Sequence, residues 1–225
     1  MPKQTFFNLP DKKRKMIIDT ALDEFGSLPY SKASLSRIVA RAGIAKGSMY
    51  QYFEDKKDLF VYLLELAAKE KLAYIQQKVD PNVDFFTAFE QTMLAGTRFG
   101  LDNPKLWQVM ANALDSMGEN VWNEFVASGK KMSLEYFCQM IKRGQEQGSI
   151  RRDIDTRLAA YMVSSMLSQG LVEYILNSLG VGTLDELLAK PELGQKLAEK
   201  DVKKMSRELK KILKSGLGEE SSNKE

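Results

Sequence analysis

The chain has 225 residues, of which 44% are hydrophobic and 28% charged, and a net charge of +3, the balance of a globular protein able to bury a core. It contains no histidine, which excludes a Ser-His-Asp or Cys-His triad and any histidine-ligated zinc or haem site. Its one cysteine, Cys138, excludes intrachain disulfides and four-cysteine metal sites. We therefore expect no metal, no cofactor and no catalytic residues.

The charge is unevenly distributed. Residues 1–57 hold 11 Lys/Arg and 6 Asp/Glu, whereas residues 58–225 hold 22 and 24. A basic front predicts contact with a polyanion, although chance clustering explains the charge equally well. The first residues lack the apolar core of a signal peptide, and no window reaches the roughly 18 uninterrupted apolar residues of a membrane span. We expect a soluble, cytoplasmic protein that makes no membrane contact.

Helical periodicity dominates the sequence and predicts an all-α fold. In the first 80 residues four helices are expected: from an Asp11 N-cap to Gly26, from Ser34 to Gly43, from about Ala45 to Phe53, and from Asp55 to about Val79. Further helices are expected around Phe85–Met93, from Asn103-Pro104, from Gly118 to near Gly148, from an Asp153 cap to Leu179, from Thr183 to before Pro191, and around Val202–Leu213. Residues 216–225 are expected to be a disordered tail.

The second and third predicted helices, separated by a turn that contains Gly43, have the spacing of a helix-turn-helix. Met49 and Phe53 would face inward, which leaves an outward set with Tyr50 beside it: Lys46, Gly47, Ser48, Gln51 and Tyr52. Gly47 in a first helical turn costs about 1 kcal/mol relative to alanine, which a close backbone approach to phosphate or base would explain. The alternative is a solvated face whose tyrosines pack against a neighbouring helix.

The stretch Ala42-Gly43-Ile44-Ala45-Lys46-Gly47-Ser48-Met49-Tyr50-x-Tyr52-Phe53, followed by Lys56 and Leu59, closely resembles the DNA-binding domain of the tetracycline-repressor (TetR) family of bacterial transcriptional regulators. The resemblance spans roughly residues 11–60. It implies an N-terminal helix-turn-helix, three-helix DNA-binding domain over residues 1–57, followed by a C-terminal helical ligand-binding and dimerisation domain over residues 58–215.

The resemblance also implies a set of DNA contacts on the two motif helices. They are Ser34, Ser36, Arg37, Ala45, Lys46, Gly47, Ser48, Tyr50, Gln51, Tyr52 and Lys56. Ser34 would cap the first motif helix and touch a phosphate, Gln51 would read an adenine, and Tyr50, Tyr52 and Lys56 would hold phosphates. The family often has Ser or Thr where this chain has Ala45, so a side-chain cap is missing there.

The larger half carries two further expectations. Apolar residues on the predicted helix from Asp153 to Leu179 form a stripe too wide for one packing partner, which indicates burial against both the core and a second subunit; a central helix in a monomer is the alternative. The resemblance implies a ligand chamber, for which the sequence offers Phe89, Met93, Trp107, Met110, Trp122, Phe125 and Tyr136. Each of these could equally be plain core.

The prediction is a sequence-specific DNA-binding regulator that is not an enzyme. It would be a homodimeric repressor, released from a palindromic operator in double-stranded DNA by a small hydrophobic effector. An activator or a ligand-independent regulator is the nearest alternative. A histidine-free helical enzyme lacks a paired-carboxylate constellation, and a protein adaptor would show little salt-sensitive binding to DNA.

Overall fold

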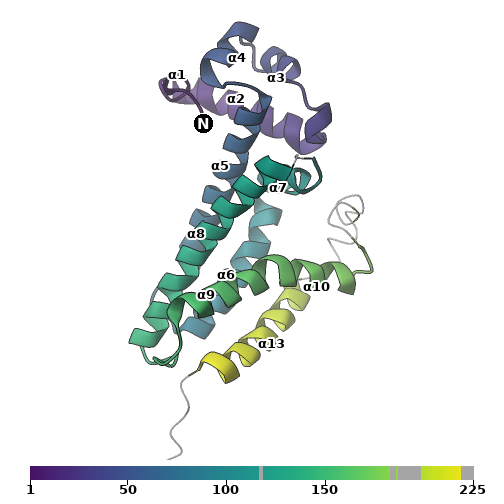
Figure 1. The fold of residues 1–225 in the computed structure, drawn as a ribbon. Coiled ribbons are helices and arrows are strands. Elements are labelled where there is room, and N and C mark those ends of the chain that lie inside the picture. Colours follow the sequence, from purple (N-terminus) through teal and green to yellow (C-terminus); the bar gives the residue numbers. More distant parts are fainter. Residues whose placement is uncertain (117–118, 183–185, 187–198, 219–225) are drawn as a thin grey trace, which may run out of the picture. The chain divides into compact units, whose positions relative to one another are not determined.

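The computed structural model describes residues 1–116, 119–182, 186 and 199–218, and within them it is helical (Figure 1). The described part contains no β-strand, and its one isolated β-bridge joins Ile150 to Gly218. The all-α prediction is confirmed. The chain divides into two compact units, the first formed by Met1–Leu72 with Gly100–Ala127 and the second by Ala73–Phe99 with Ser128–Glu225.

The first unit is larger than the predicted segment 1–57, because it recruits a helix from much later in the chain. Its elements are α1 (Gln4–Phe7), α2 (Asp11–Ser27), a 3₁₀ turn η1 (Tyr30–Lys32), α3 (Leu35–Arg41), α4 (Lys46–Tyr52), most of α5 (Lys56–Lys78), and α7 (Pro104–Ser116). Its core is largely aromatic, with fully buried Phe6, Phe25, Phe53 and Phe60.

Helix α7 is held against α2 by packing and by polar contacts. Gly26 faces α7, and a Cβ there would lie 3.6 Å from the Gln108 Cβ atom, an ordinary van der Waals distance. The Asn112 amide donates to the carbonyls of Phe25 and Gly26, each at 2.9 Å, and Lys105 pairs with Asp23. Asn112 therefore satisfies carbonyls in the last turn of α2 that have no partner within the helix.

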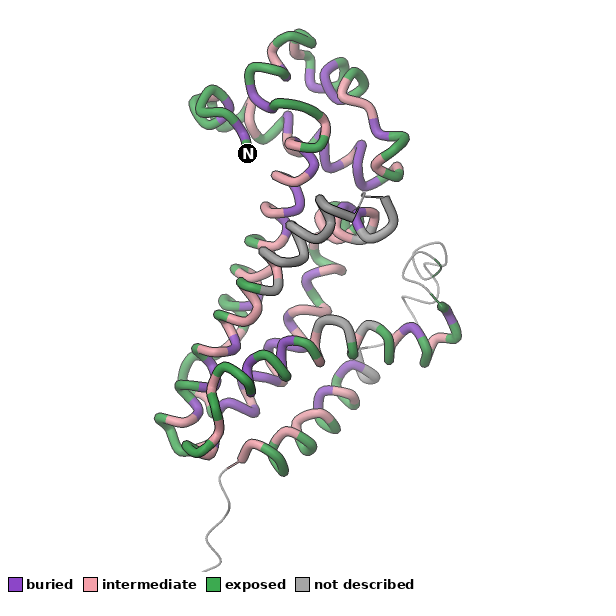
Figure 2. Tube along the Cα trace, viewed as in Figure 1, coloured by how far each residue is buried: buried purple, intermediate pink, exposed green. Residues whose placement is uncertain are grey.

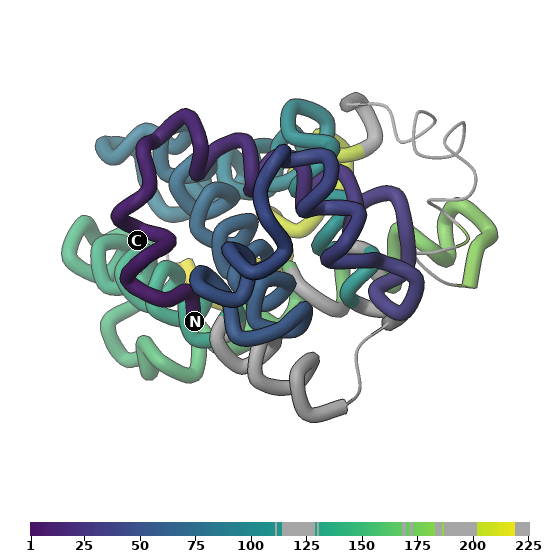
Figure 3. The backbone as a smooth tube through the Cα atoms, turned by 90° about the horizontal axis from the view of Figure 1, so that it is seen from above, coloured from purple at the N-terminus to yellow at the C-terminus, as the bar shows by residue number. Residues whose placement is uncertain are grey.

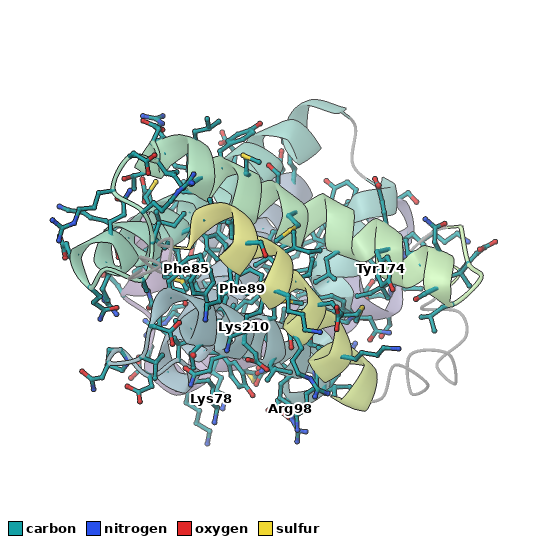
Figure 4. The ribbon with its side chains drawn as sticks, turned by 90° about the horizontal axis from the view of Figure 1, so that it is seen from below. Lys78, Phe85, Phe89, Arg98, Tyr174 and Lys210 are labelled. Atoms are coloured by element: carbon teal, nitrogen blue, oxygen red, sulfur yellow. The ribbon has the colours of Figure 1, made fainter. Side chains whose placement is uncertain are left out.

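The second unit has its own core. Its helices are most of α6 (Phe85–Asp102), the larger part of α8 (Glu119–Glu146), α9 (Thr156–Ser165), a π-helical turn η2 (Met166–Gly170), α10 (Leu171–Ser178) and α13 (Glu199–Leu217). Phe85 and Phe89 of α6 pack with residues of α8 and α9 such as Ile141 and Val163. Helix α13 covers this core, and the Lys210 ammonium on it donates to the Glu90 carboxylate at 3.2 Å (Figure 4).

Several predicted helix ends need correction. Asp11 is the first residue of α2 rather than its N-cap, which is Pro10. Helix α9 is capped by Asp155 rather than Asp153, because the Asp155 carboxylate accepts from the Leu158 amide at 2.6 Å. Residues 216 and 217, expected in a disordered tail, belong to α13, which ends at Leu217. Residues 219–225 of the expected tail lie outside the described residues. The short helix predicted from Thr183 lies outside the described residues.

Candidate nucleic-acid interface

The turn between α3 and α4 has the geometry of a helix-turn-helix. Gly43 adopts φ 61°, a left-handed conformation that residues with a side chain rarely adopt. The amide of Ile44 then donates to the Val39 carbonyl at 3.2 Å and closes the turn. Ile38, Val39 and Met49 are buried in the first core. The two helices are therefore fixed by the same core and present the rest of their surfaces outward.

Helix α4 and its N-cap Ala45 expose most of their own residues that were predicted to meet DNA (Figure 2). Ala45, Lys46, Gly47, Tyr50 and Gln51 are exposed, and Tyr50 retains 47% of its surface. The space around Gly47 is open, since a Cβ there would meet nothing within 4 Å. Packing within the chain therefore does not require glycine at this position, which agrees with a backbone approached by a partner.

Two other predicted positions on α4, Tyr52 and Ser48, are less accessible. Tyr52, expected to point outward, is buried with 6% of its surface exposed, and its ring lies 6.2 Å from that of Phe6. Tyr52 follows Met49 by three residues and so shares its inward face. Ser48 is half-buried and Ser36 is exposed. Tyr52 is therefore first a core residue, and only its edge could reach a phosphate.

The start of α3 is organised by a buried carboxylate that the sequence analysis missed. Glu24 accepts from the Ser34 amide at 2.9 Å and from the Arg37 guanidinium, whose Nε and Nη2 atoms lie 2.8 and 2.6 Å away. Burial alone would raise the pKa of Glu24, but hydrogen bonds from Arg37 and Ser34 and the charges of Arg37 and Arg41 lower it. An acid among the apolar residues of α2 was the available signal.

This arrangement changes the expected roles of Ser34 and Arg37. Ser34 occupies the N-cap position of α3, but its side chain makes no capping hydrogen bond, contrary to the prediction. Arg37 also donates to the Lys32 carbonyl at 2.6 Å and keeps 52% of its side chain exposed. The contacts of Arg37 with Glu24 and Lys32 hold its guanidinium in place at the start of α3. The rest of the side chain is exposed to solvent.

Lys56 is likewise tied into the protein. Its ammonium donates to the carbonyls of Tyr30 and Ala33 at 2.9 and 3.1 Å, and lies 4.4 Å from the centroid of the Tyr30 ring. An ammonium has three donors, so one remains for a phosphate oxygen. The geometry assigns Lys56 a structural role in joining the start of α5 to the segment before α3, in addition to any contact with DNA.

The residues predicted to line a chamber fall into both cores. Phe89 and Met93 are buried in the second unit, where the Tyr136 hydroxyl lies 3.0 Å from that of Thr92. Met110 packs on the first core, and Trp107 lies against Gly100. The side chains of Trp122 and Phe125 lie outside the described residues. A single chamber lined by all seven therefore stays a prediction.

Beside Trp107 lies a cation that the sequence analysis did not single out. The Lys71 ammonium is 5.9 Å from the centroid of the Trp107 ring. Within the part of the chain that the structure describes, Lys71 makes no hydrogen bond or ion pair. Its side chain is half-buried, and desolvation lowers its pKa. A half-buried ammonium to which the described residues offer no carboxylate partner is a suitable counter-charge for an anionic ligand.

Helices α9 and α10 each carry exposed apolar side chains, together called the stripe. Leu158, Met162 and Tyr174 keep 61%, 63% and 59% of their surfaces exposed, and Tyr174 lies apart from the Phe85–Phe89 cluster (Figure 4). In an uninterrupted α-helix Tyr174 would be rotated about 120° from Met162. The π-helical turn η2 contributes one extra residue and reduces this angle to about 20°. The turn therefore keeps the stripe on one face.

A fixed helix-turn-helix with an exposed polar second helix defines a DNA-binding protein. A family model described as bacterial regulatory proteins, tetR family, matches residues 17–63. The crystal structure of a TetR family transcriptional regulator from Chloroflexus aurantiacus J-10-FL is 34% identical in sequence, with 97% of this chain and 99% of that chain covered and a TM-score of 0.62. The chain belongs to the TetR family of transcriptional regulators.

Two further similarities are to a regulator of fatty acid metabolism and to a regulator solved with stearoyl-CoA. The fatty acid metabolism regulator protein of Bacillus subtilis is 24% identical over 168 residues, which are 73% of this chain and 84% of that protein. The transcriptional regulator FadR from Bacillus subtilis, solved in complex with stearoyl-CoA, is 19% identical, with coverages of 85% and 96% and a TM-score of 0.63. This second likeness concerns the fold alone.

Among the described residues, no group of three or more Cys, Asp and Glu side chains is placed to hold a metal ion. In the same residues, no helix combines the length and the apolar character needed to cross a membrane.

Proposed function

We propose that this regulator is a homodimeric repressor that binds a palindromic operator through α4 and releases it when a small effector binds. The exposed face of α4 on a buried helix-turn-helix carries the proposal. Lys46, Gly47, Tyr50 and Gln51 would face the major groove, with Gln51 reading a base edge. Ser36, Arg37 and the remaining donor of Lys56 would meet phosphates. The protein would act in the bacterial cytoplasm.

A second copy of the chain is the partner proposed for the stripe on α9 and α10. An exposed apolar face rimmed by polar residues marks an interaction surface. A twofold dimer would place two copies of α4 on successive major-groove faces, which is why the operator is expected to be palindromic. Sedimentation should give twice the monomer mass at micromolar concentration, and a monomer bound to an asymmetric duplex would contradict the proposal.

DNA binding can be tested with duplexes selected from a random pool by the purified protein. The expected result is a selected palindrome whose affinity falls steeply with salt, because most contacts go to phosphates and release counterions. Mobility shifts across a salt series measure the slope. Equal affinity for every duplex, or affinity independent of salt, would contradict a sequence-specific regulator.

For the effector we propose an apolar molecule with an anionic group that faces Lys71. The ligand would replace the water around an ammonium that has no other anion near it in the described structure. The relative solved with stearoyl-CoA makes long-chain acyl-CoA the first probe to try. Stearoyl-CoA should raise the melting temperature, and free CoA should not. Lys71→Met should abolish this rise, whereas Lys69→Met, which changes an exposed lysine of the same helix, should preserve it.

Release requires that effector and operator oppose each other. Helix α5 begins at Lys56 beside the helix-turn-helix, so a tilt of α5 would change the spacing of the two α4 helices in a dimer. Linkage then demands that the operator weaken effector binding by the same factor by which effector weakens operator binding. Titration calorimetry with and without operator measures this factor. An unchanged effector dissociation constant would contradict ligand-released repression.

A further inference from the structure

The first nine residues, which precede the segment matched by the family model, contact the end of α4. In Figures 1 and 3 the start of the chain lies beside α4, and Phe6 of α1 is fully buried in the first core. Its ring centroid is 4.8 Å from that of Phe53 and 5.5 Å from that of Tyr62. The segment is therefore anchored next to the residue that ends α4.

Besides an ion pair between the Met1 amino group and Asp58 of α5, this segment makes polar contacts with carbonyls that α4 leaves without an intrahelical partner. The last four carbonyls of any α-helix lack such a partner. In α4 the Met49 carbonyl accepts a hydrogen bond from the Phe53 amide. The Lys3 amide donates to the Tyr52 carbonyl at 2.8 Å, and the Lys3 ammonium donates to the Tyr50 carbonyl at 2.9 Å. The Thr5 hydroxyl donates to the Gln51 carbonyl.

We propose that residues 1–9 are a clamp for the reading helix, in which Lys3 and Thr5 are positioning residues for operator recognition. A seven-residue helix is marginal by itself, because the nucleation cost is spread over few hydrogen bonds. The clamp satisfies three carbonyls and places a cation at the negative end of the helix dipole. Helix α4 is then already ordered before it meets DNA. The conformational entropy of ordering Tyr50 and Gln51 therefore does not reduce the affinity for the operator.

The clamp is itself held from the far side. The Arg14 guanidinium of α2 donates to the carbonyls of Phe7 and Leu9 at 2.9 and 3.3 Å, and the amide of Leu9 donates to the Phe6 carbonyl at 3.2 Å. These contacts fix the segment at both ends. Lys3 and Thr5 therefore hold the last turn of α4 in a fixed position relative to the core. The proposal depends on the proposed function in one respect, which is that α4 recognises the operator.

The test uses the full chain with Lys3→Met and Thr5→Val, singly and together, and with Lys69→Met as the matched control for loss of an exposed lysine. In DNA-free protein, hydrogen exchange of the Tyr52 and Phe53 amides should become about tenfold faster in the double variant, with exchange in α2 unchanged, because about two hydrogen bonds are lost at one helix end. This measurement does not depend on DNA. Unchanged exchange in α4 would overturn the clamp.

Binding then separates positioning from direct contact. The double variant should bind the selected operator about tenfold more weakly and random duplex less than twofold more weakly, because non-specific binding needs only phosphate contacts. The salt slope should stay the same. A slope reduced by about one, with exchange unchanged, would make Lys3 a phosphate contact and overturn the clamp. Absence of any specific operator for the wild-type chain would contradict the proposed function and leave the exchange result standing.

Discussion

The two units of this regulator handle their polar and apolar groups in opposite ways. In the first unit several polar side chains are tied to partners within the chain: Arg37 donates to Glu24, Lys56 donates to two carbonyls, and Asn112 donates to carbonyls at the end of α2. In the second unit an apolar stripe of Leu158, Met162 and Tyr174 faces outward. The first unit therefore holds its polar side chains through contacts within the chain, whereas the second leaves apolar side chains exposed, which the proposed dimer would cover.

The sharpest way to break this comparison is to charge the stripe. Met162→Glu should turn the dimer into a monomer, because a carboxylate would have to be desolvated at the centre of an apolar contact. Operator affinity should then fall by about 100-fold or more, since two linked reading helices bind with an effective concentration that a monomer lacks. Sedimentation and operator titration measure the two effects. Met162→Leu, which stays apolar, should preserve both, and a charged variant that remains dimeric would refute the assignment of the stripe.

The stiffness of the first unit can be tested at its buried carboxylate. Arg37→Met leaves the Glu24 charge without its main partner and should lower the free energy of unfolding by about 2–3 kcal/mol, less than for a fully buried pair because Arg37 is half exposed. Urea denaturation measures the loss. Glu24→Gln with Arg37→Met should recover part of it, and full additivity of the two changes would show that the pair is not coupled.

The same pair predicts a dependence on pH. The pKa of Glu24 is lower in the folded protein than its ordinary value of about 4.3. Its contribution to stability is therefore fully present above pH 4.3 and is lost as the pH falls through the folded-state pKa. Glu24→Gln should be less stable at pH 7 and should lose less stability below pH 4 than wild type. Parallel curves down to pH 3 would contradict the ion pair.

The helices could be predicted from the sequence because their signals are local. Asn103-Pro104 begins α7 and Gly43 ends the first motif helix, as expected. For Tyr52 the local pattern was ambiguous, since it shares the inward face of Met49 yet lies next to Phe53, and its cover, Phe6, lies 46 residues earlier in a segment without periodicity. The π-helical turn η2 could not be predicted from the sequence either. Its one-residue shift is recognised only when the exposed residues on its two sides are compared in the structure.

The reading of bases by α4 is a finer prediction. Gln51→Ala should relax the preference at one base pair of each half-site by roughly 1–3 kcal/mol, because a bidentate amide contact discriminates one base. Tyr50→Phe, which removes only a hydroxyl, should weaken binding to all sequences alike. Binding to a set of single-substitution operators measures both effects. An unchanged preference in Gln51→Ala would mean that another residue reads that position.

Substitution of Gly47 is expected to have the smallest effects, and they should be opposite in sign for the stability of the free protein and for its affinity for the operator. A Cβ at this position meets nothing within 4 Å in the free protein, and the residue lies in the first turn of α4 with no left-handed backbone. Gly47→Ala should therefore stabilise the free protein by about 0.5–1 kcal/mol, the difference in helix propensity between the two residues. If the α4 backbone approaches DNA here, the same methyl group should weaken operator binding several-fold, because it fills the space that a phosphate or base edge would occupy. Thermal unfolding measures the first effect and operator titration the second. A variant that is both more stable and equally tight in binding would show that α4 meets DNA through its side chains alone, with its backbone held away from the groove.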